Sequence, residues 1–139
     1  MVNALEKAWS ALHADGALVE IRPDIEFAYR IGIVSDGGRI TAGRLVNPVF
    51  DQDLLAAGAA VNEVLHQGRY KLEGVRRHPY RVRLDRLTDV PRYIQAIGEP
   101  KPRFVAGTRA RLRQLWRGRT TNTRIEVTDG MVISLLRKR

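Results

Sequence analysis

The sequence contains no cysteine, so disulfides, thiolate metal ligands and cysteine nucleophiles are all excluded. It also lacks long hydrophobic runs. The longest apolar stretch, Leu54 to Val61, is far shorter than the roughly 20 residues that a membrane-spanning helix needs. The N-terminus has no apolar core of the kind found in signal peptides. We therefore expect a cytoplasmic protein that does not enter a membrane.

Acidic residues are scarce, with 15 Asp and Glu against 24 Lys and Arg, which gives a formal net charge of +9. Such a surplus favours polyanions, so nucleic acid is a candidate partner. Most of the surplus is arginine, whose planar guanidinium suits phosphate. The alternative is that the arginines reflect only the codon usage of a GC-rich bacterial genome.

The composition, 44% hydrophobic and 28% charged, is typical of a folded protein. A chain of 139 residues is long enough to bury a core, and its length suits one domain. We therefore predict a single domain over residues 1–139.

The first segment predicts an amphipathic helix that leads into a strand. Asn3 is the expected N-cap, and Asp15-Gly16 is the expected helix end. The strand, Ala17 to Ile21, is continuously apolar except for Glu20, which is typical of a strand covered on both faces, and Pro23 closes it. Four apolar residues share one face of the helix at helical spacing: Leu5, Ala8, Trp9 and Leu12.

The next two elements are predicted from alternation and helical spacing. Ile25 to Val34 and Arg39 to Leu45 read as strands of a hairpin that turns at Asp36-Gly37-Gly38. Asp51 to Gln67 then has helical spacing, with Asp51 as the expected N-cap and Gly68 as the stop.

The second half of the chain predicts extended structure and two further helices. Arg69 to Leu87 reads as strand with a break at His78-Pro79, and a short helix follows Thr88-Asp89. A further helix is expected over Phe104 to Trp116. The Asp129-Gly130 pair predicts a hairpin between strands at Thr123–Asp129 and Met131–Arg137.

Two groups of arginines are candidate contacts for an anion or a nucleic acid. The alternation around Tyr80 and Val82 puts two arginines on one polar sheet face, next to two more across the predicted break. Three others recur at i, i+4 and i+8 on one helix face, where a solvated surface is the alternative interpretation. The seven candidates are Arg76, Arg77, Arg81, Arg83, Arg109, Arg113 and Arg117.

No catalytic, cofactor-binding or metal-ligating residue is predicted. His13, His66 and His78 are scattered, and no local signature of a nucleophile with its base is present. The pair Glu63 and His66 has the spacing of half a di-iron carboxylate site, but the second pair that such a site needs is missing.

The order of these elements resembles the C-terminal half of a class I S-adenosylmethionine-dependent methyltransferase. The resemblance runs from the helix and apolar strand at residues 3–23 to the final stretch EVTDGMVISLLRKR. It implies an α+β fold with a partial mixed sheet and covering helices. It also implies that Ala17–Ile21 is the family's fifth strand, with the antiparallel seventh strand beside it.

The family holds its cofactor on a Gly-x-Gly loop after the first strand and on an acidic residue that ends the second. The sequence contains neither, so the resemblance implies a truncated domain without a cofactor site of its own. Three functions remain open: a non-catalytic interaction or ligand-binding module, the substrate half of a split methyltransferase, or an unrelated basic nucleic-acid-binding module.

An unpaired fifth strand would be an apolar edge at Ala17–Ile21, because its other neighbour in the family is the fourth strand. Soluble proteins cover, charge or pair such edges. We therefore expect a homodimer, or a complex with a separate cofactor-binding polypeptide, unless the hairpin at Ile25–Leu45 folds back over the edge.

Overall fold

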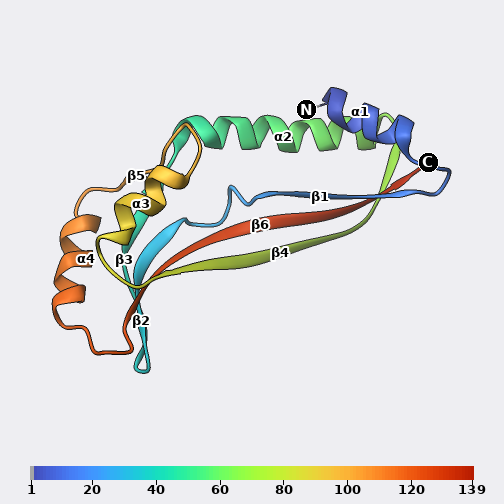
Figure 1. Cartoon of the computed structure of the whole chain (residues 1–139). Helices are drawn as coiled ribbons and strands as arrows, with labels where there is room; N and C mark the ends of the chain where they lie inside the picture. The colour runs from blue at the N-terminus through green and yellow to red at the C-terminus, as the bar shows by residue number, and fades with distance from the viewer. Residues whose placement is uncertain (1) are drawn as a thin grey trace. The chain divides into compact units, whose positions relative to one another are not determined.

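The computed structural model describes residues 2–139 as four helices and an open antiparallel sheet of six strands (Figure 1). The predicted α+β class is therefore confirmed. The chain groups into two compact units: unit 1 holds the residues up to 26, 50–78 and 130–139, and unit 2 holds 27–49 and 79–129. Two long strands, β4 (Tyr70–Leu84) and β6 (Arg124–Lys138), contribute residues to both units.

Unit 1 combines α1 (Val2–Ala11), β1 (Ala17–Pro23) and almost all of α2 (Pro48–His66) with parts of β4 and β6. Strand β1 pairs antiparallel with β6, from Ala17 opposite Arg137 to Pro23 opposite Met131. Both helices supply one face of the core, which consists of Leu5, Ala60, Val61, Val64, Tyr70 and Leu136.

Two hydrogen bonds, one buried and one partly buried, hold α1 against this core. The Trp9 indole Nε1 donates to the carbonyl of Arg69 at 2.9 Å, and the Tyr70 hydroxyl donates to the carbonyl of Leu5 at 2.9 Å. The ammonium of Lys138 lies 4.4 Å from the centre of the Trp9 ring, within cation–π range. The predicted apolar face of the first helix is confirmed, because Leu5 is buried and Trp9 and Leu12 pack on the same cluster.

Unit 2 is a sheet with two helices on one face. Strands β2 (Arg30–Ser35) and β3 (Gly38–Val46) form the predicted hairpin, and Gly38 takes the positive φ of 110° that its turn requires. Strand β2 also pairs with β6, and β3 pairs with the short β5 (Arg103–Phe104). Helices α3 (Asp89–Ala96) and α4 (Thr108–Arg117) supply Val90 and Leu112 to a core with Ile31, Ile33, Ala42, Leu45, Ile125 and Val127.

Glycine at position 43 lets α4 begin directly on β3. A Cβ at Gly43 would lie 2.1 Å from the Thr108 hydroxyl oxygen, so no larger residue fits without displacing the helix. The backbone N–H of Arg44 donates to that same oxygen at 3.3 Å. The close approach therefore sets where α4 and its arginines start.

The helix ends differ from the predictions at four places. Helix α1 already includes Val2, so Asn3 lies inside it and is not the cap, and it ends at Ala11 rather than at Asp15-Gly16. Helix α2 begins at Pro48, because proline suits a first turn whose N–H groups have no partner, and Asp51 is therefore internal. The helix expected from Phe104 starts only at Thr108, since Phe104 pairs with β3.

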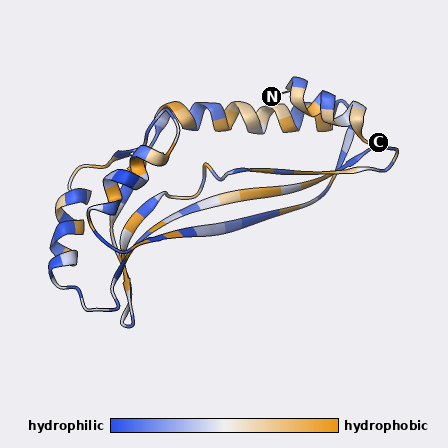
Figure 2. Cartoon of the chain, in the orientation of Figure 1, coloured by the Kyte–Doolittle hydropathy of each residue, from blue (hydrophilic) through white to orange (hydrophobic). Residues whose placement is uncertain are grey.

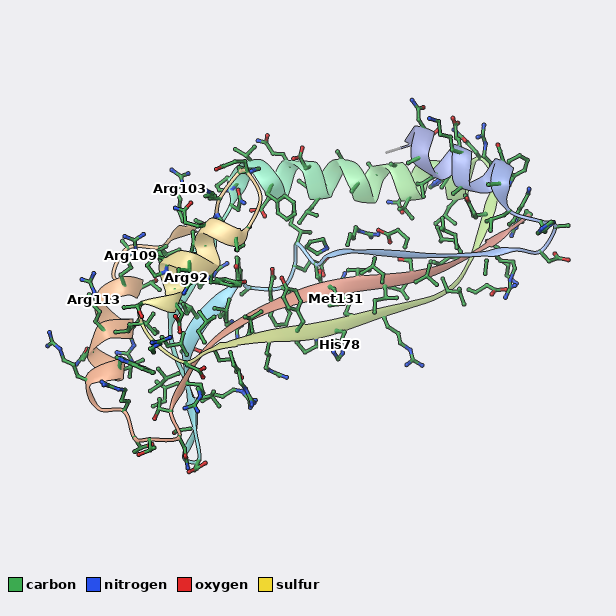
Figure 3. All side chains as sticks on the ribbon, in the orientation of Figure 1. His78, Arg92, Arg103, Arg109, Arg113 and Met131 are labelled. Atoms are coloured by element: carbon green, nitrogen blue, oxygen red, sulfur yellow. The ribbon has the colours of Figure 1, made fainter. Side chains whose placement is uncertain are left out.

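Three strand predictions were also wrong. Strand β1 is not covered on both faces, since Val19 and Ile21 are 56% and 62% exposed. Residues 25–29 precede β2 rather than extend it, because the Asp24 carboxylate accepts the N–H of Glu26 at 3.1 Å and bends the chain there. Strand β4 runs without a break through His78, labelled in Figure 3, and Pro79, since β6 is its only strand partner in residues 2–139 and an edge strand tolerates proline.

The predicted C-terminal hairpin is also wrong. Residues 124–138 form one strand, whose first part pairs with β2 and whose last part pairs with β1. An Asp-Gly pair turns a chain back only when its two flanks pair with each other. Here each flank has another partner, and Asp129-Gly130 marks the change between them.

All four tyrosines have a raised pKa, because burial disfavours the charged tyrosinate. In unit 2 the hydroxyls of Tyr29 and Tyr93 lie 2.9 Å apart, and the Tyr80 hydroxyl donates to Asp129 at 3.3 Å. Burial, followed by the nearby Asp129 charge, raises the pKa of Tyr80 to about 12.

These shifts predict a loss of stability in alkali. A tyrosine whose pKa is raised on folding stabilises the folded state at pH values below its unfolded pKa of 10.0. For Tyr80 this contribution to stability is lost as the pH rises through about 12. In an ultraviolet titration, the native chain should therefore form little tyrosinate at pH 10, where the urea-unfolded chain is half ionised. The variant Tyr80→Phe should lose the transition near pH 12. Superimposable native and unfolded titrations would contradict this account.

Candidate functional site

The sheet face of unit 2 opposite α3 and α4 carries a buried carboxylate among arginines. Glu126 is only 5% exposed. Its Oε1 lies 2.7 Å from Nε of Arg39 and 3.8 Å from Nε of Arg81, and its Oε2 lies 3.5 Å from Nε of Arg83. Arg81 and Arg83 were predicted to share one polar face, and their common partner Glu126 supports that prediction.

The strand register explains why these groups meet. Glu126 lies opposite Gly32 of β2, which lies opposite Thr41 of β3. Since Ile125 and Val127 point into the core, Glu126 must point to the other face. Gly32 has no side chain to fill the space beside Glu126, and a Cβ there would lie 2.2 Å from the carbonyl oxygen of Ile40.

A cavity of about 270 Å³ opens over this region of unit 2. Its lining combines the Glu126 carboxylate with arginines, threonines and one aromatic ring. The polar and aromatic lining residues are Phe27, Arg30, Arg39, Thr41, Arg81, Glu126 and Thr128. Arg30 faces Thr128 directly in the β2–β6 pairing, which places it on the same face as Glu126.

Positive charge exceeds negative charge around Glu126. Glu126 is buried, whereas the side chains of Arg39, Arg81 and Arg83 are 54%, 44% and 61% exposed. A buried carboxylate requires charged or hydrogen-bonding partners, and here it holds several guanidinium groups in one place. The exposed ends of the arginines still offer N–H donors and positive charge to a ligand.

One oxygen of Glu126 is not satisfied. Among the described residues, Oε2 has no hydrogen-bond partner although it is shielded from solvent, because Arg83 lies at ion-pair distance without hydrogen-bond geometry. A buried acceptor without a donor costs about 1–3 kcal/mol. Glu126 lines the cavity, and a ligand donor that reached its Oε2 would satisfy this acceptor.

The other predicted arginines lie elsewhere. Arg77 pairs with the buried Asp24 at 3.3 Å and with Glu26, and it lines a separate cavity of about 340 Å³ in unit 1. Arg76 is exposed on β4 of the same unit. The predicted cluster of four is thus divided between the two units, and the break that was expected to join the pairs does not exist.

The three arginines of α4 are exposed, and the ribbon of this helix is largely blue, meaning hydrophilic, in Figure 2. Arg109 stacks over the Phe104 ring, with 4.6 Å from its guanidinium carbon to the ring centre. Arg109 and Arg113 also line a cavity of about 460 Å³ between α3 and α4, with Val90, Ile94 and other apolar residues below them. Figure 3 shows Arg92 on α3 and Arg103 on β5 in the same part of unit 2, whereas Arg117 does not line the cavity.

Glu126 and Arg39 were not predicted as site residues. The available signal was a carboxylate between two apolar residues in the stretch Arg124-Ile-Glu-Val-Thr128. Alternation alone puts that carboxylate on a polar face, and only the register reveals the arginines around it.

The histidines do not form a site. His66 contacts the carbonyl of Asn62 one helical turn before it, at 2.9 Å. Within residues 2–139, no group of three or more His, Asp and Glu side chains is arranged to hold a metal ion.

Comparison with known proteins gave no match to a family model, to a curated protein or to a solved structure. In the part of the chain that the structure describes, no helix combines the length and apolarity needed to cross a membrane.

Proposed function

We propose that the chain is a non-catalytic, methyltransferase-like half domain that acts in the cytoplasm as an interaction module. Its function would be assembly with a second polypeptide through the open edge of β1. The observation that carries this proposal is the environment of β1, which pairs on one side and exposes apolar side chains.

Strand β1 has no partner on its second edge among residues 2–139. Its pairing with β6 extends over all seven of its residues, so the strand is fully formed and offers a regular row of backbone groups. Val19 and Ile21 are 56% and 62% exposed. An exposed apolar edge of this kind is a template for pairing with another chain.

The face beside this edge is also apolar. Ile21 lies opposite Ile133, and Val19 lies opposite Leu135, so the four side chains share one face of the β1–β6 pair. On β4, which also pairs with β6, Val75 is 50% exposed. Burying this apolar surface in an interface would be favourable, at about 25 cal/mol per Å².

The resemblance to class I methyltransferases suggests what the open edge of β1 would pair with. In class I methyltransferases the fifth strand lies beside the antiparallel seventh, and β1 pairs with residues 131–137 in that manner. The open edge of β1 would then be the position of the family's fourth strand. A second chain that pairs there would complete the sheet.

A second copy of the chain is the partner we favour, because a two-fold axis would pair the open edge of β1 with itself. A separate polypeptide with a cofactor-binding half is the other form of the proposal, and that pair would be a split methyltransferase. The arginines around Glu126 favour a second function, binding of nucleic acid, which does not depend on the β1 edge.

The homodimer is tested by light scattering after size exclusion at micromolar concentration and moderate salt. The wild-type chain should give twice its 15.7 kDa. The double variant Val19→Lys, Ile21→Lys should be monomeric, because charges on an edge strand oppose pairing. The matched control Ile40→Lys, at a residue 48% exposed on β3, should remain dimeric. A wild-type monomer would reject the homodimer.

The absence of a cofactor site is tested by calorimetry. Because the sequence contains neither cofactor motif of the family, the isolated chain should not bind S-adenosylmethionine. Binding with micromolar affinity would contradict the non-catalytic proposal. Heat of binding that develops only after a co-purified cellular partner is added would favour the split enzyme.

A further inference from the structure

The cavity at Glu126 has the chemistry of a site for one base of a single-stranded nucleic acid. We propose that an unstacked cytosine binds there, with its amino group donating to Oε2 of Glu126 and its neighbouring phosphates on the arginines. This inference rests on the second proposed function, nucleic-acid binding. Beyond that function, it specifies where the nucleic acid binds, that it is single-stranded and which base it prefers.

The donor requirement comes from Glu126. Its Oε1 already accepts from Nε of Arg39 at 2.7 Å, whereas Oε2 accepts no hydrogen bond within the described chain. A ligand can reach Oε2 by displacing the side chain of Arg83, which is 61% exposed and only loosely paired at 3.5 Å. The ligand must therefore present an N–H or O–H group to a carboxylate oxygen.

The charge requirement comes from the arginines. Arg30, Arg39 and Arg81 line the cavity. Arg83 lies on the same face through its contact with Glu126. Arginine forks bind phosphate with paired N–H donors, and several on one face can follow a phosphate backbone. A nucleotide combines anionic phosphate groups with a base that can carry an amino donor, and it therefore meets both requirements.

The planar groups of the cavity suit a base. Phe27 lines the cavity together with Arg39 and Arg81, and both phenyl rings and guanidinium planes stack on nucleobases. A base inside a duplex is already stacked and paired, so only a single-stranded segment can insert one. The proposed ligand is therefore single-stranded.

The size and the acceptor favour a pyrimidine with an amino group. The cavity of about 270 Å³ is smaller than the roughly 300–1,000 Å³ of pockets that hold drug-sized ligands. Carboxylates accept from the N4 amino group of cytosine. Uracil has nearly the same shape but presents an acceptor, O4, at that position. It would leave Oε2 unsatisfied and repel it.

The experiment uses the full chain and fluorescent oligomers of about eight nucleotides, a usual length for single-strand sites. Oligocytidine and oligouridine are compared by anisotropy at low and moderate salt, and the deoxy forms distinguish RNA from DNA. Oligocytidine should bind more tightly by about three- to tenfold, the range of one hydrogen bond. Equal affinity for oligocytidine and oligouridine would contradict the proposed cytosine site but not the proposed binding of nucleic acid. No binding at low salt would overturn both.

Variants separate the base contact from the phosphate contacts. Glu126→Gln should abolish the preference for oligocytidine, since an amide can accept from cytosine or donate to uracil. The overall affinity of this variant for the oligomers should not fall, because the substitution removes a negative charge from the site. Arg30→Gln should weaken both oligomers equally. The triple variant Arg109→Gln, Arg113→Gln, Arg117→Gln removes three positive charges from α4, against one in Arg30→Gln, and should still change neither affinity appreciably. A loss of about tenfold or more in the triple variant would move the contact to α4 and overturn the proposal.

Discussion

The pairing of one strand, β6, with β2 over its first part and with β1 over its last part is the constraint on which the rest of the structure depends. Ile125 and Val127, at odd positions, are buried in unit 2, whereas Val132 and Leu136, at even positions, are buried in unit 1. The parity of the residues that face the apolar cores therefore changes at Asp129-Gly130. The alternate residues of β6 point away from these cores and belong to the two candidate binding surfaces. Glu126 lies on the polar face of unit 2, and Ile133 and Leu135 lie beside the β1 edge.

These two surfaces use different physics and need not act together. The β1 edge offers apolar side chains and unpaired backbone groups, so its contribution to assembly would depend little on salt. The face around Glu126 offers exposed guanidinium groups, whose contacts with phosphate weaken steeply as salt rises. The salt dependence of a binding event thus distinguishes contacts made by the arginines from contacts made by the apolar edge of β1.

Local patterns predicted most elements but not their partners. The apolar spacing of Leu5 and Trp9, the glycines after Asp36 and the stop at Gly68 each act within a few residues, and these predictions agree with the structure. Whether Asp129-Gly130 turns the chain depends on which strands lie beside it, and this is a long-range property. The same limit applied to the site: the Arg81–Arg83 face follows from alternation, but Glu126 and Arg39 meet it only through the register.

The central claim, that the open edge of β1 pairs with a second copy, is tested most directly by amide hydrogen exchange across β1. In an antiparallel pair alternate residues of a strand bond to each neighbour, so about half of the β1 amides should point to β6 and the others outward. The amides that face β6 should exchange slowly at every protein concentration. The outward ones should exchange rapidly in dilute solution and become protected as concentration rises. Outward amides whose exchange rates do not change with concentration would contradict the claim.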